Sequence, residues 1–361
     1  MDVNKILAGL RMGLNIADAV KEAGGDILDP NVGLTLFFDR RFSNASTLGR
    51  TVDSLVYLFR DDFPSLSFRE VVSFPSCGNT LKGYLYRTAQ TWHKGLVLYV
   101  HGLTGQADDI YAIGQDRFLS AGYDVFAIDL TASGRSGGNG IPGLHQSALD
   151  VKAATEYLST RGDLNGMPLF FFGHSWGAYG VAASLNFASV RPHAVAAVSG
   201  FDNPLAEMMA IPQEKVGFPI PVDRAPLEEA LRRRAGEHYS LSASRGIAES
   251  GVPALVVHGQ DDHTVPFAVS TYAMLGTSHA EKLLLPGGHM DLFFSPEAAS
   301  RAKETKQKAG AMLKTEKIDL ASLPKESLEQ LRSCFDRRGN SILNERLFGA
   351  VDAFFTEHAG S

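Results

Sequence analysis

The sequence predicts an α/β protein built on a mostly parallel, doubly wound sheet. The prediction depends on six short, nearly continuous apolar runs, because strands buried on both faces have this composition. The runs are 95–102, 123–130, 168–175, 193–200, 253–259 and 280–287. Segments with helical spacing, such as 144–162, separate most of them and are long enough for right-handed crossovers. Such alternation forms parallel sheets with helices on both faces.

The other segments are assigned around this sheet. Residues 1–66 are predicted to form a mainly helical N-terminal extension, whose apolar face we expect to pack on the protein's own core. The runs 68–74 and 80–87 flank "PSCGN" and are typical of an antiparallel hairpin. Two intervals are too long for crossovers. The Pro-rich 203–248 is predicted to be an inserted cap, and the charged 295–343 a helical excursion before a closing helix, all within one domain of residues 67–361.

Composition excludes several classes of protein. The 361 residues carry a formal net charge of -6 and no basic run, so nucleic acid is not an expected partner. No apolar stretch is long enough to span a bilayer, and the N-terminus does not resemble a signal peptide. Cys77 and Cys334 form no CxxC pair, so neither a metal site nor a disulfide framework is indicated. We expect a cytoplasmic protein, and the sequence leaves its oligomeric state open.

Ser175 is the candidate nucleophile. It is the serine of Gly173-His174-Ser175-Trp176-Gly177, a G-x-S-x-G pattern that directly follows a predicted buried strand and precedes a predicted helix. A sharp strand-to-helix turn strains the serine, and flanking glycines remove Cβ atoms that would collide there. The pattern in this context favours a nucleophile over a serine in an ordinary turn.

A serine nucleophile needs a base, and His289 is the candidate. It lies in "PGGHMD", a glycine-rich loop after the last predicted strand. Histidines are the usual bases for serine, and a third group orients them. Three other histidines, at strand ends with apolar neighbours, are expected to be buried structural residues: His101, His174 and His258.

Three carboxylates are candidates for the group that orients His289. Asp262 ranks first, because it follows the preceding strand and gives the chain order Ser, Asp, His. Asp202, after the strand before the cap, ranks second, and Asp261 ranks third. An ordinary role for Asp262, as the cap of a helix that begins near Pro266, stays open.

Acyl transfer also needs donors for the developing oxyanion, and backbone amides supply them. The candidates are the amides of Trp176, directly after the nucleophile, and of Leu103 in "YVHGLTGQ". Gly102 and Gly105 would let this loop approach a substrate closely.

The sequence resembles the serine-hydrolase branch of the α/β-hydrolase superfamily, which includes lysophospholipase-like esterases and serine aminopeptidase-like members. The resemblance rests on "YVHGLTG", "FAIDLTASGRSGG", "GHSWGAYG", "VVHGQDDHTVP" and "PGGHMD", which occur in the family's order. It covers most of 67–295 and the last helix, with Ser133 in place of a more usual histidine. It implies a triad of Ser175, Asp262 and His289, and no cofactor or metal.

The predicted function is hydrolysis of small carboxylic esters, of short to medium acyl length, through an acyl-enzyme. Apolar residues of the cap are expected to line the acyl pocket: Met208, Met209, Ile211, Val216, Phe218 and Ile220. One alternative is an aminopeptidase in which Glu228 and Glu229 hold a substrate amine. Another is a binding protein that keeps the fold without the chemistry.

Overall fold

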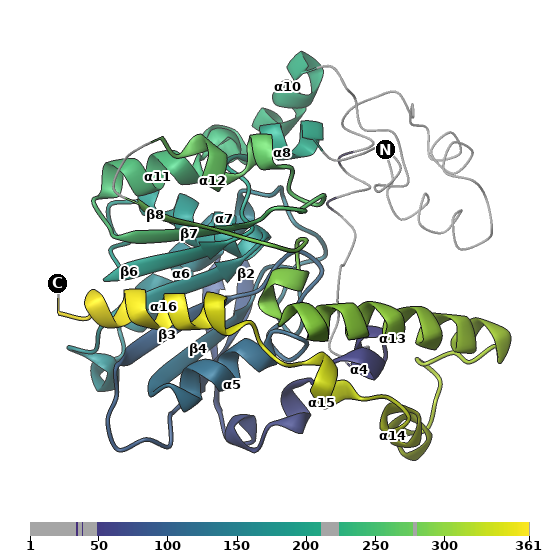
Figure 1. The fold of residues 1–361 in the computed structure, drawn as a ribbon. Coiled ribbons are helices and arrows are strands. Elements are labelled where there is room, and N and C mark those ends of the chain that lie inside the picture. Colours follow the sequence, from purple (N-terminus) through teal and green to yellow (C-terminus); the bar gives the residue numbers. More distant parts are fainter. Residues whose placement is uncertain (1–33, 35–37, 39–48, 211–223, 277–279, 361) are drawn as a thin grey trace.

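The structure, a computed structural model, describes residues 34, 38, 49–210, 224–276 and 280–360. Within these residues, eight strands form one sheet in the order β1-β2-β4-β3-β5-β6-β7-β8 (Figure 1). They are β1 (Glu70–Ser76), β2 (Asn79–Tyr86), β3 (Gly95–Val100), β4 (Tyr123–Asp129), β5 (Leu169–His174), β6 (Ala194–Val198), β7 (Ala254–Gly259) and β8 (Ala280–Leu285). β2 runs antiparallel to β1 and β4, and the other neighbouring pairs are parallel. The predicted fold class is confirmed.

The hairpin turn between β1 and β2 follows from its two central residues. Ser76 pairs with Asn79, which leaves Cys77 and Gly78 to make the connection. Both have positive φ, 46° at Cys77 and 81° at Gly78. Two-residue turns of this kind match the twist of antiparallel strands. The predicted hairpin is therefore present, with its turn inside the expected "PSCGN".

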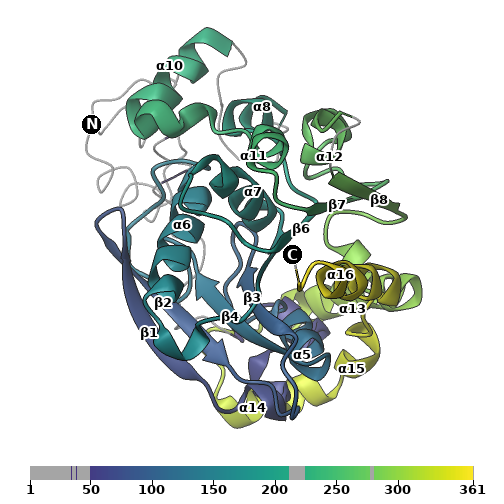
Figure 2. The same cartoon turned by 90° about the vertical axis from the view of Figure 1, so that its left-hand side faces the viewer.

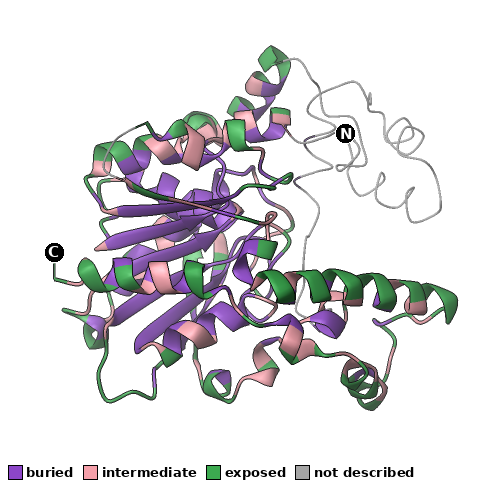
Figure 3. Ribbon diagram, viewed as in Figure 1, coloured by how far each residue is buried: buried purple, intermediate pink, exposed green. Residues whose placement is uncertain are grey.

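Helices cover both faces of the sheet and bury two apolar clusters (Figures 2 and 3). One face carries α6 (Gln146–Ser159), α7 (Trp176–Ala183) and α11 (Ala243–Ser250), and the other carries α5 (Ala112–Ser120) and α16 (Glu345–Glu357). Along β3, Leu98 enters the first cluster whereas Val97 and Tyr99 enter the second. Successive strand side chains point to opposite faces, so a sheet covered twice needs continuous apolar runs.

The predicted cap interval, 203–248, is described in part. Its described residues form α8 (Pro204–Ala210), α10 (Arg224–Ala235), the 3-10 turn η6 (Gly236–Ser240) and the first part of α11. Residues 211–223 lie outside the described residues, and so do Ile211, Val216, Phe218 and Ile220 of the predicted acyl pocket. Apart from Leu34 and Phe38, residues 1–48 of the predicted helical extension, 1–66, also lie outside the described residues.

Two segments that the family resemblance does not cover pack against each other. Residues 295–343 contain α13 (Pro296–Thr315), α14 (Lys325–Ser333) and α15 (Arg337–Asn340), and α13 lies beside the short α4 (Asp53–Val56) in Figure 1. A third apolar cluster joins them, formed by Leu55, Ala309, Leu320 and Leu328. Arg337 adds an ion pair to Asp62, with Nη1 2.9 Å from Oδ1. In the described part of the chain, no helix combines the length and apolar character of a membrane span.

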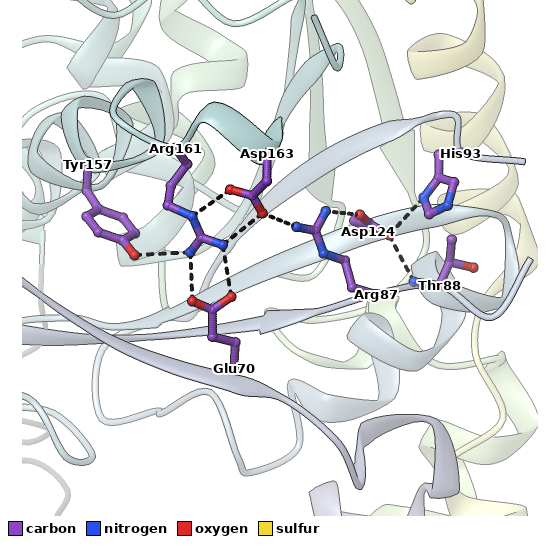
Figure 4. Close-up of polar contacts among 8 residues, drawn as sticks. All are labelled: Glu70, Arg87, Thr88, His93, Asp124, Tyr157, Arg161 and Asp163. Carbon is purple, nitrogen blue, oxygen red and sulfur yellow. Dashed lines mark hydrogen bonds and ion pairs between the residues drawn. The ribbon is translucent and has the colours of Figure 1, made fainter. Parts of the chain in front are cut away.

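An ion-pair network links strands and loops at the edge of the sheet at which the parallel strands begin (Figure 4). Arg87 directly follows β2, and its Nη1 lies 2.8 Å from Oδ2 of the buried Asp124 of β4. Arg87 also forms an ion pair with Asp163. Arg161 binds Asp163 and, at 2.9 Å, Glu70 of β1. The hydrogen bonds to Asp163 and Glu70 raise the pKa of the Arg161 guanidinium. Ligand sites of such sheets lie at the opposite, carboxyl ends of the strands, so we assign this network to stability.

His145, which directly precedes α6, is expected to make the protein acid-sensitive. Burial, with the charges of His238 and Arg234, lowers the pKa of His145 from 6.5 to about 4. Its contribution to stability is therefore complete above pH 6.5 and is lost as the pH falls toward 4, because only the unfolded chain binds the proton. The expected slope is about 1.4 kcal/mol per pH unit from this one group.

Urea unfolding at several values between pH 6.5 and pH 4.5 tests the role of His145. The free energy of unfolding should fall less steeply in His145→Gln than in the wild type, because other acid-titrating groups are common to both proteins. Equal slopes in the two proteins would contradict the assignment.

Candidate active site

Ser175 occupies a strained turn between β5 and α7. Its backbone has φ 57° and ψ -118°, a conformation that non-glycine residues rarely adopt. Its amide donates to the Val198 carbonyl over 2.8 Å, which fixes the turn against β6. A Cβ at Gly173 would lie 2.4 Å from the Gly177 oxygen, and one at Gly177 would lie 2.3 Å from the Val100 oxygen. Close backbone packing thus requires both glycines of the pattern.

The ring of His289, in the loop after β8, joins two other side chains. Its Nε2 lies 2.8 Å from Ser175 Oγ, and its Nδ1 lies 2.8 Å from Asp262 Oδ2. An ionised carboxylate only accepts, so Nδ1 carries the proton and Nε2 accepts from the serine hydroxyl. The loops after β5, β7 and β8 thus bring a hydroxyl, a carboxylate and an imidazole into one hydrogen-bonded chain.

Asp262 is held as a buried carboxylate. Its side chain has 0% exposure, and its Oδ1 accepts the amides of Thr264 and Val265, each over 2.9 Å. Burial by itself would raise the pKa of this carboxyl. The hydrogen bond and charge of His289, with the two amides, outweigh burial and leave the pKa of Asp262 below its ordinary value. The side chain is therefore ionised near neutral pH.

The two other candidate carboxylates have different surroundings. Asp202 accepts the hydroxyl of Ser242 over 3.0 Å and the amide of Ser244 over 2.8 Å, which ties it to the start of α11. Asp261 is exposed, and its amide donates to the Gly287 carbonyl. Of the three carboxylates, the described structure brings only Asp262 within hydrogen-bond distance of His289.

The candidate oxyanion donors flank the serine. The amide of Gly105 donates to the Gly102 carbonyl over 3.1 Å and closes a tight turn after β3 that contains Leu103. A Cβ at Gly102 would lie 3.1 Å from Ser175 Cβ, so this turn runs directly beside the serine. Trp176 is the first residue of α7, and amides of a first helical turn have no acceptor within the helix. We call residues 102–105 the oxyanion turn.

Sequence reasoning missed the carboxylate that supports the loop after this turn. Asp129, the last residue of β4, accepts the Ala107 amide over 2.9 Å through Oδ1. Its Oδ2 accepts the Tyr84 hydroxyl over 2.6 Å and the Arg135 amide over 2.9 Å. Asp129 therefore joins the loops that follow β3 and β4. It is the aspartate of "DLTASGRSGG", so the motif marked it, but the sequence alone gave it no role.

The three strand-end histidines are all buried. His101 lies with Nδ1 2.7 Å from the carbonyl oxygen of Gly102, and burial lowers its pKa. His174 reaches the backbone oxygen of His289. Burial also lowers the pKa of His258, so all three rings are neutral near pH 7.

The described residues of the predicted acyl pocket differ in exposure. Met208 on α8 is 1% exposed and belongs to the apolar cluster that includes α7, whereas Met209 is 41% exposed. Across the described part of the chain, no group of three or more His, Cys, Asp or Glu side chains is arranged to hold a metal ion. The arrangement at Ser175 can activate a hydroxyl with protein groups alone.

The eight-stranded, mostly parallel sheet with helices on both faces has the α/β-hydrolase fold. Residues 91–201 match the family model described as "Serine aminopeptidase, S33". This stretch runs from β3 to just beyond β6 and includes Ser175.

Curated relatives match about half of the chain. An uncharacterised protein of Mycobacterium tuberculosis is 32% identical over 161 residues, which are 44% of this chain and 50% of that protein. The uncharacterised protein YfhR of Salmonella typhi is 27% identical over 211 residues, 55% of this chain and 65% of YfhR. The chain thus spans about half to two thirds of the length of these relatives.

Solved structures with a similar fold include an esterase and a peptidase. The Pyrococcus furiosus esterase Pf2001 is 19% identical with a TM-score of 0.48, and the match covers 73% of this chain and 95% of the esterase. The acylaminoacyl peptidase of Pyrococcus horikoshii is 15% identical with a TM-score of 0.46, over 72% of this chain and 44% of the peptidase.

Proposed function

We propose that this protein is a serine hydrolase that cleaves carboxylic esters through an acyl-enzyme, with Ser175, His289 and Asp262 as its catalytic triad. The observation that supports this most is the hydrogen-bonded chain from Ser175 Oγ through His289 to Asp262, 2.8 Å at each step. The first group of this hydrogen-bonded series is the hydroxyl of a serine in a strained turn. Backbone strain of this kind is usually kept at functional sites. A serine kept only for structure would need neither the base nor the buried carboxylate behind it.

In the proposed reaction, His289 first acts as a general base. Its Nε2 takes the proton of the Ser175 hydroxyl while Oγ attacks the ester carbonyl carbon. The backbone amides of Leu103 and Trp176 donate hydrogen bonds to the oxyanion that forms. The ionised Asp262 stabilises the imidazolium that forms. His289 then protonates the leaving alcohol, and the acyl group remains on Ser175. A water molecule activated by His289 releases the acid and regenerates the serine.

The alternative activity is peptide hydrolysis, which the name of the matching family model favours. The carboxylates considered for amine binding already have partners. Glu228 accepts the Tyr239 hydroxyl over 2.9 Å and pairs with Arg232, and Glu229 pairs with Arg233 over 2.9 Å. An ester also has the better leaving group. These points favour an ester as the substrate.

The proposed organisation is a hydrolase domain, 67–361, with a cap at 203–248 and a helical excursion at 295–343, preceded by an extension at 1–66. We place the protein in the cytoplasm, because Cys77 and Cys334 are exposed free thiols, which suit a reducing compartment. The proposed binding partner is a small ester substrate. A formal net charge of -6 does not favour binding to nucleic acid, whose backbone is also negatively charged.

Esters of short to medium acyl length are expected to be better substrates than peptides. The measurement is kcat/KM for a series of p-nitrophenyl esters beside aminoacyl p-nitroanilides, with Glu228→Gln as a second protein. Esters should be turned over faster, and Glu228→Gln should leave both activities unchanged. An anilide that is cleaved faster than the best ester, with loss of that activity in Glu228→Gln, would favour the aminopeptidase.

A further inference from the structure

Two buried side chains connect the oxyanion turn to the loop that carries His289. Tyr111, the residue before α5, places its hydroxyl 2.8 Å from Nδ1 of His174. Nε2 of the same ring lies 2.9 Å from the backbone oxygen of His289. Tyr111 is 5% exposed and His174 is 2% exposed, so bulk water has little access to either hydrogen bond. We call this chain of contacts the Tyr111–His174 relay.

The chemistry of the groups fixes where each proton lies. The His289 carbonyl only accepts, so Nε2 of His174 carries the ring proton. Burial, together with the charge of His289, lowers the pKa of His174 to about 3, so Nδ1 is unprotonated and accepts from the Tyr111 hydroxyl. Burial raises the pKa of Tyr111, so the hydroxyl keeps its proton. Tyr111 thus selects the tautomer of His174 that can donate to His289.

The relay is packed tightly on both sides. A Cβ at Gly102 would lie 2.6 Å from the Tyr111 hydroxyl, and one at Gly105 would lie 2.6 Å from the Tyr111 ring, so the oxyanion turn rests directly on this residue. On the other side, the ring of Phe293 meets the His174 ring edge-on at a centroid distance of 4.8 Å. Neither relay ring can move without displacing a loop of the site.

The hydrogen bond from His174 anchors the backbone of the His289 loop at His289 itself, whereas the amide of Asp261 holds this loop two residues earlier, at Gly287. The loop contains Gly287, with φ 116°, and Gly288, and glycines leave the backbone few intrinsic restraints. Asp262 holds the Nδ1 end of the ring, and the Nε2 end contacts only the Ser175 hydroxyl, whose proton it takes in the proposed reaction. These two contacts leave the ring free to shift when its own backbone shifts. The hydrogen bond from His174 reaches the carbonyl of His289 itself and fixes the point from which the ring projects.

We propose that Tyr111 and His174 are positioning residues that hold the His289 backbone so that Nε2 stays within reach of Ser175 Oγ during proton transfer. This inference rests on the proposed function, since it requires His289 to act as the base. The ring centroids of His174 and His289 are 4.8 Å apart. At this distance a positive charge on His174 would destabilise the imidazolium that forms on His289 during attack, so a neutral His174 suits the position. Besides the charge of His289, that of Asp262 acts on His174 and raises its pKa, but burial outweighs it.

Tyr111→Phe, beside a matched tyrosine control, tests the relay. Tyr99 is 1% exposed, its ring is 6.3 Å from that of Tyr111, and its hydroxyl has no hydrogen-bond partner among the described residues. Tyr99→Phe should leave ester turnover and fluorophosphonate labelling unchanged. Tyr111→Phe should lower kcat and the labelling rate about tenfold at constant KM, because a small misplacement of a catalytic group costs up to about 10² in rate.

Substitution of His174 supplies a rescue experiment. His174→Gln keeps an N–H for the His289 carbonyl and an oxygen for the Tyr111 hydroxyl, whereas His174→Leu keeps neither. We expect His174→Leu to lose about 10²-fold in kcat and His174→Gln to recover at least tenfold of that loss. Thermal unfolding of each variant shows whether the fold survives. Recovery by Gln at an equal unfolding temperature separates positioning from a role in stability.

The outcomes distinguish the relay from the proposed function. Wild-type protein that turns over ester while Tyr111→Phe matches Tyr99→Phe in kcat and labelling rate would overturn the relay alone. Equal kcat in His174→Gln and His174→Leu would overturn it as well. Wild-type protein that neither cleaves esters nor is labelled at Ser175 would overturn the proposed function, and the relay with it.

Discussion

Ser175→Ala is expected to lower kcat for ester hydrolysis by about 10⁶, because the members of such a triad act as one unit. Alanine keeps the Cβ of serine, so the turn with φ 57° should form as before. Only the hydroxyl that lies 2.8 Å from His289 is lost. Circular dichroism and thermal unfolding should be unchanged, and initial rates with a p-nitrophenyl ester give the loss in kcat.

Ser199 offers a matched control for this substitution. It follows β6, has φ 54°, and its buried hydroxyl has no hydrogen-bond partner among the described residues. Ser199→Ala should therefore leave kcat unchanged. A Ser175→Ala protein that retains more than a few per cent of wild-type activity would show that another group is the nucleophile.

Asp262→Asn is expected to cause the second largest loss, on the order of 10⁴ in kcat. The carboxylate now accepts from Nδ1 of His289 and so leaves Nε2 free to take the serine proton. An amide can donate to Nδ1 instead, which would place the ring proton on Nε2 and block the base. The same ester assay measures the effect, and KM should change little.

Two neighbouring aspartates serve as controls. Asp261→Asn should leave kcat unchanged, because this residue is exposed. Asp202→Asn should weaken the contacts to Ser242 and Ser244 and lower the unfolding temperature, with little effect on kcat. If Asp202→Asn reduced kcat more than Asp262→Asn does, the orienting acid would follow β6 instead of β7.

The sheet could be predicted because its signal is local. The parallel strands β3 to β7 are buried almost throughout, so each appears in the sequence as an apolar run. The edge strand β8 is partly exposed, at Glu281 and Lys282, but still contains the apolar run of Leu283 to Leu285. All of β3 through β8 begin and end within two residues of the predicted runs. Cys77 and Gly78 likewise mark the hairpin turn locally. The order of the strands, with β4 between β2 and β3, depends on contacts between segments that are distant in the sequence, and the apolar runs alone do not predict it.

The site could be predicted only where a motif or a strand end marked it. Ser175 stands in a recognisable pattern, whereas His289 is 114 positions away and was chosen because it follows a strand. The Tyr111–His174 relay has no sequence signal of this kind. It depends on a side chain meeting a backbone oxygen 115 positions away, and no spacing rule describes such a contact. Similarly, the sequence ranked three aspartates, and only their different contacts separate them.

The most direct test of the account is the site of covalent labelling by a fluorophosphonate. The reagent phosphonylates only a serine that a nearby base activates, so its target does not depend on the substrate. We predict one adduct per chain by intact-mass measurement, located on the peptide that contains Ser175, and no adduct in Ser175→Ala. A wild-type protein without an adduct would show a binding protein that keeps only the fold, and an adduct on another serine would contradict the proposed triad.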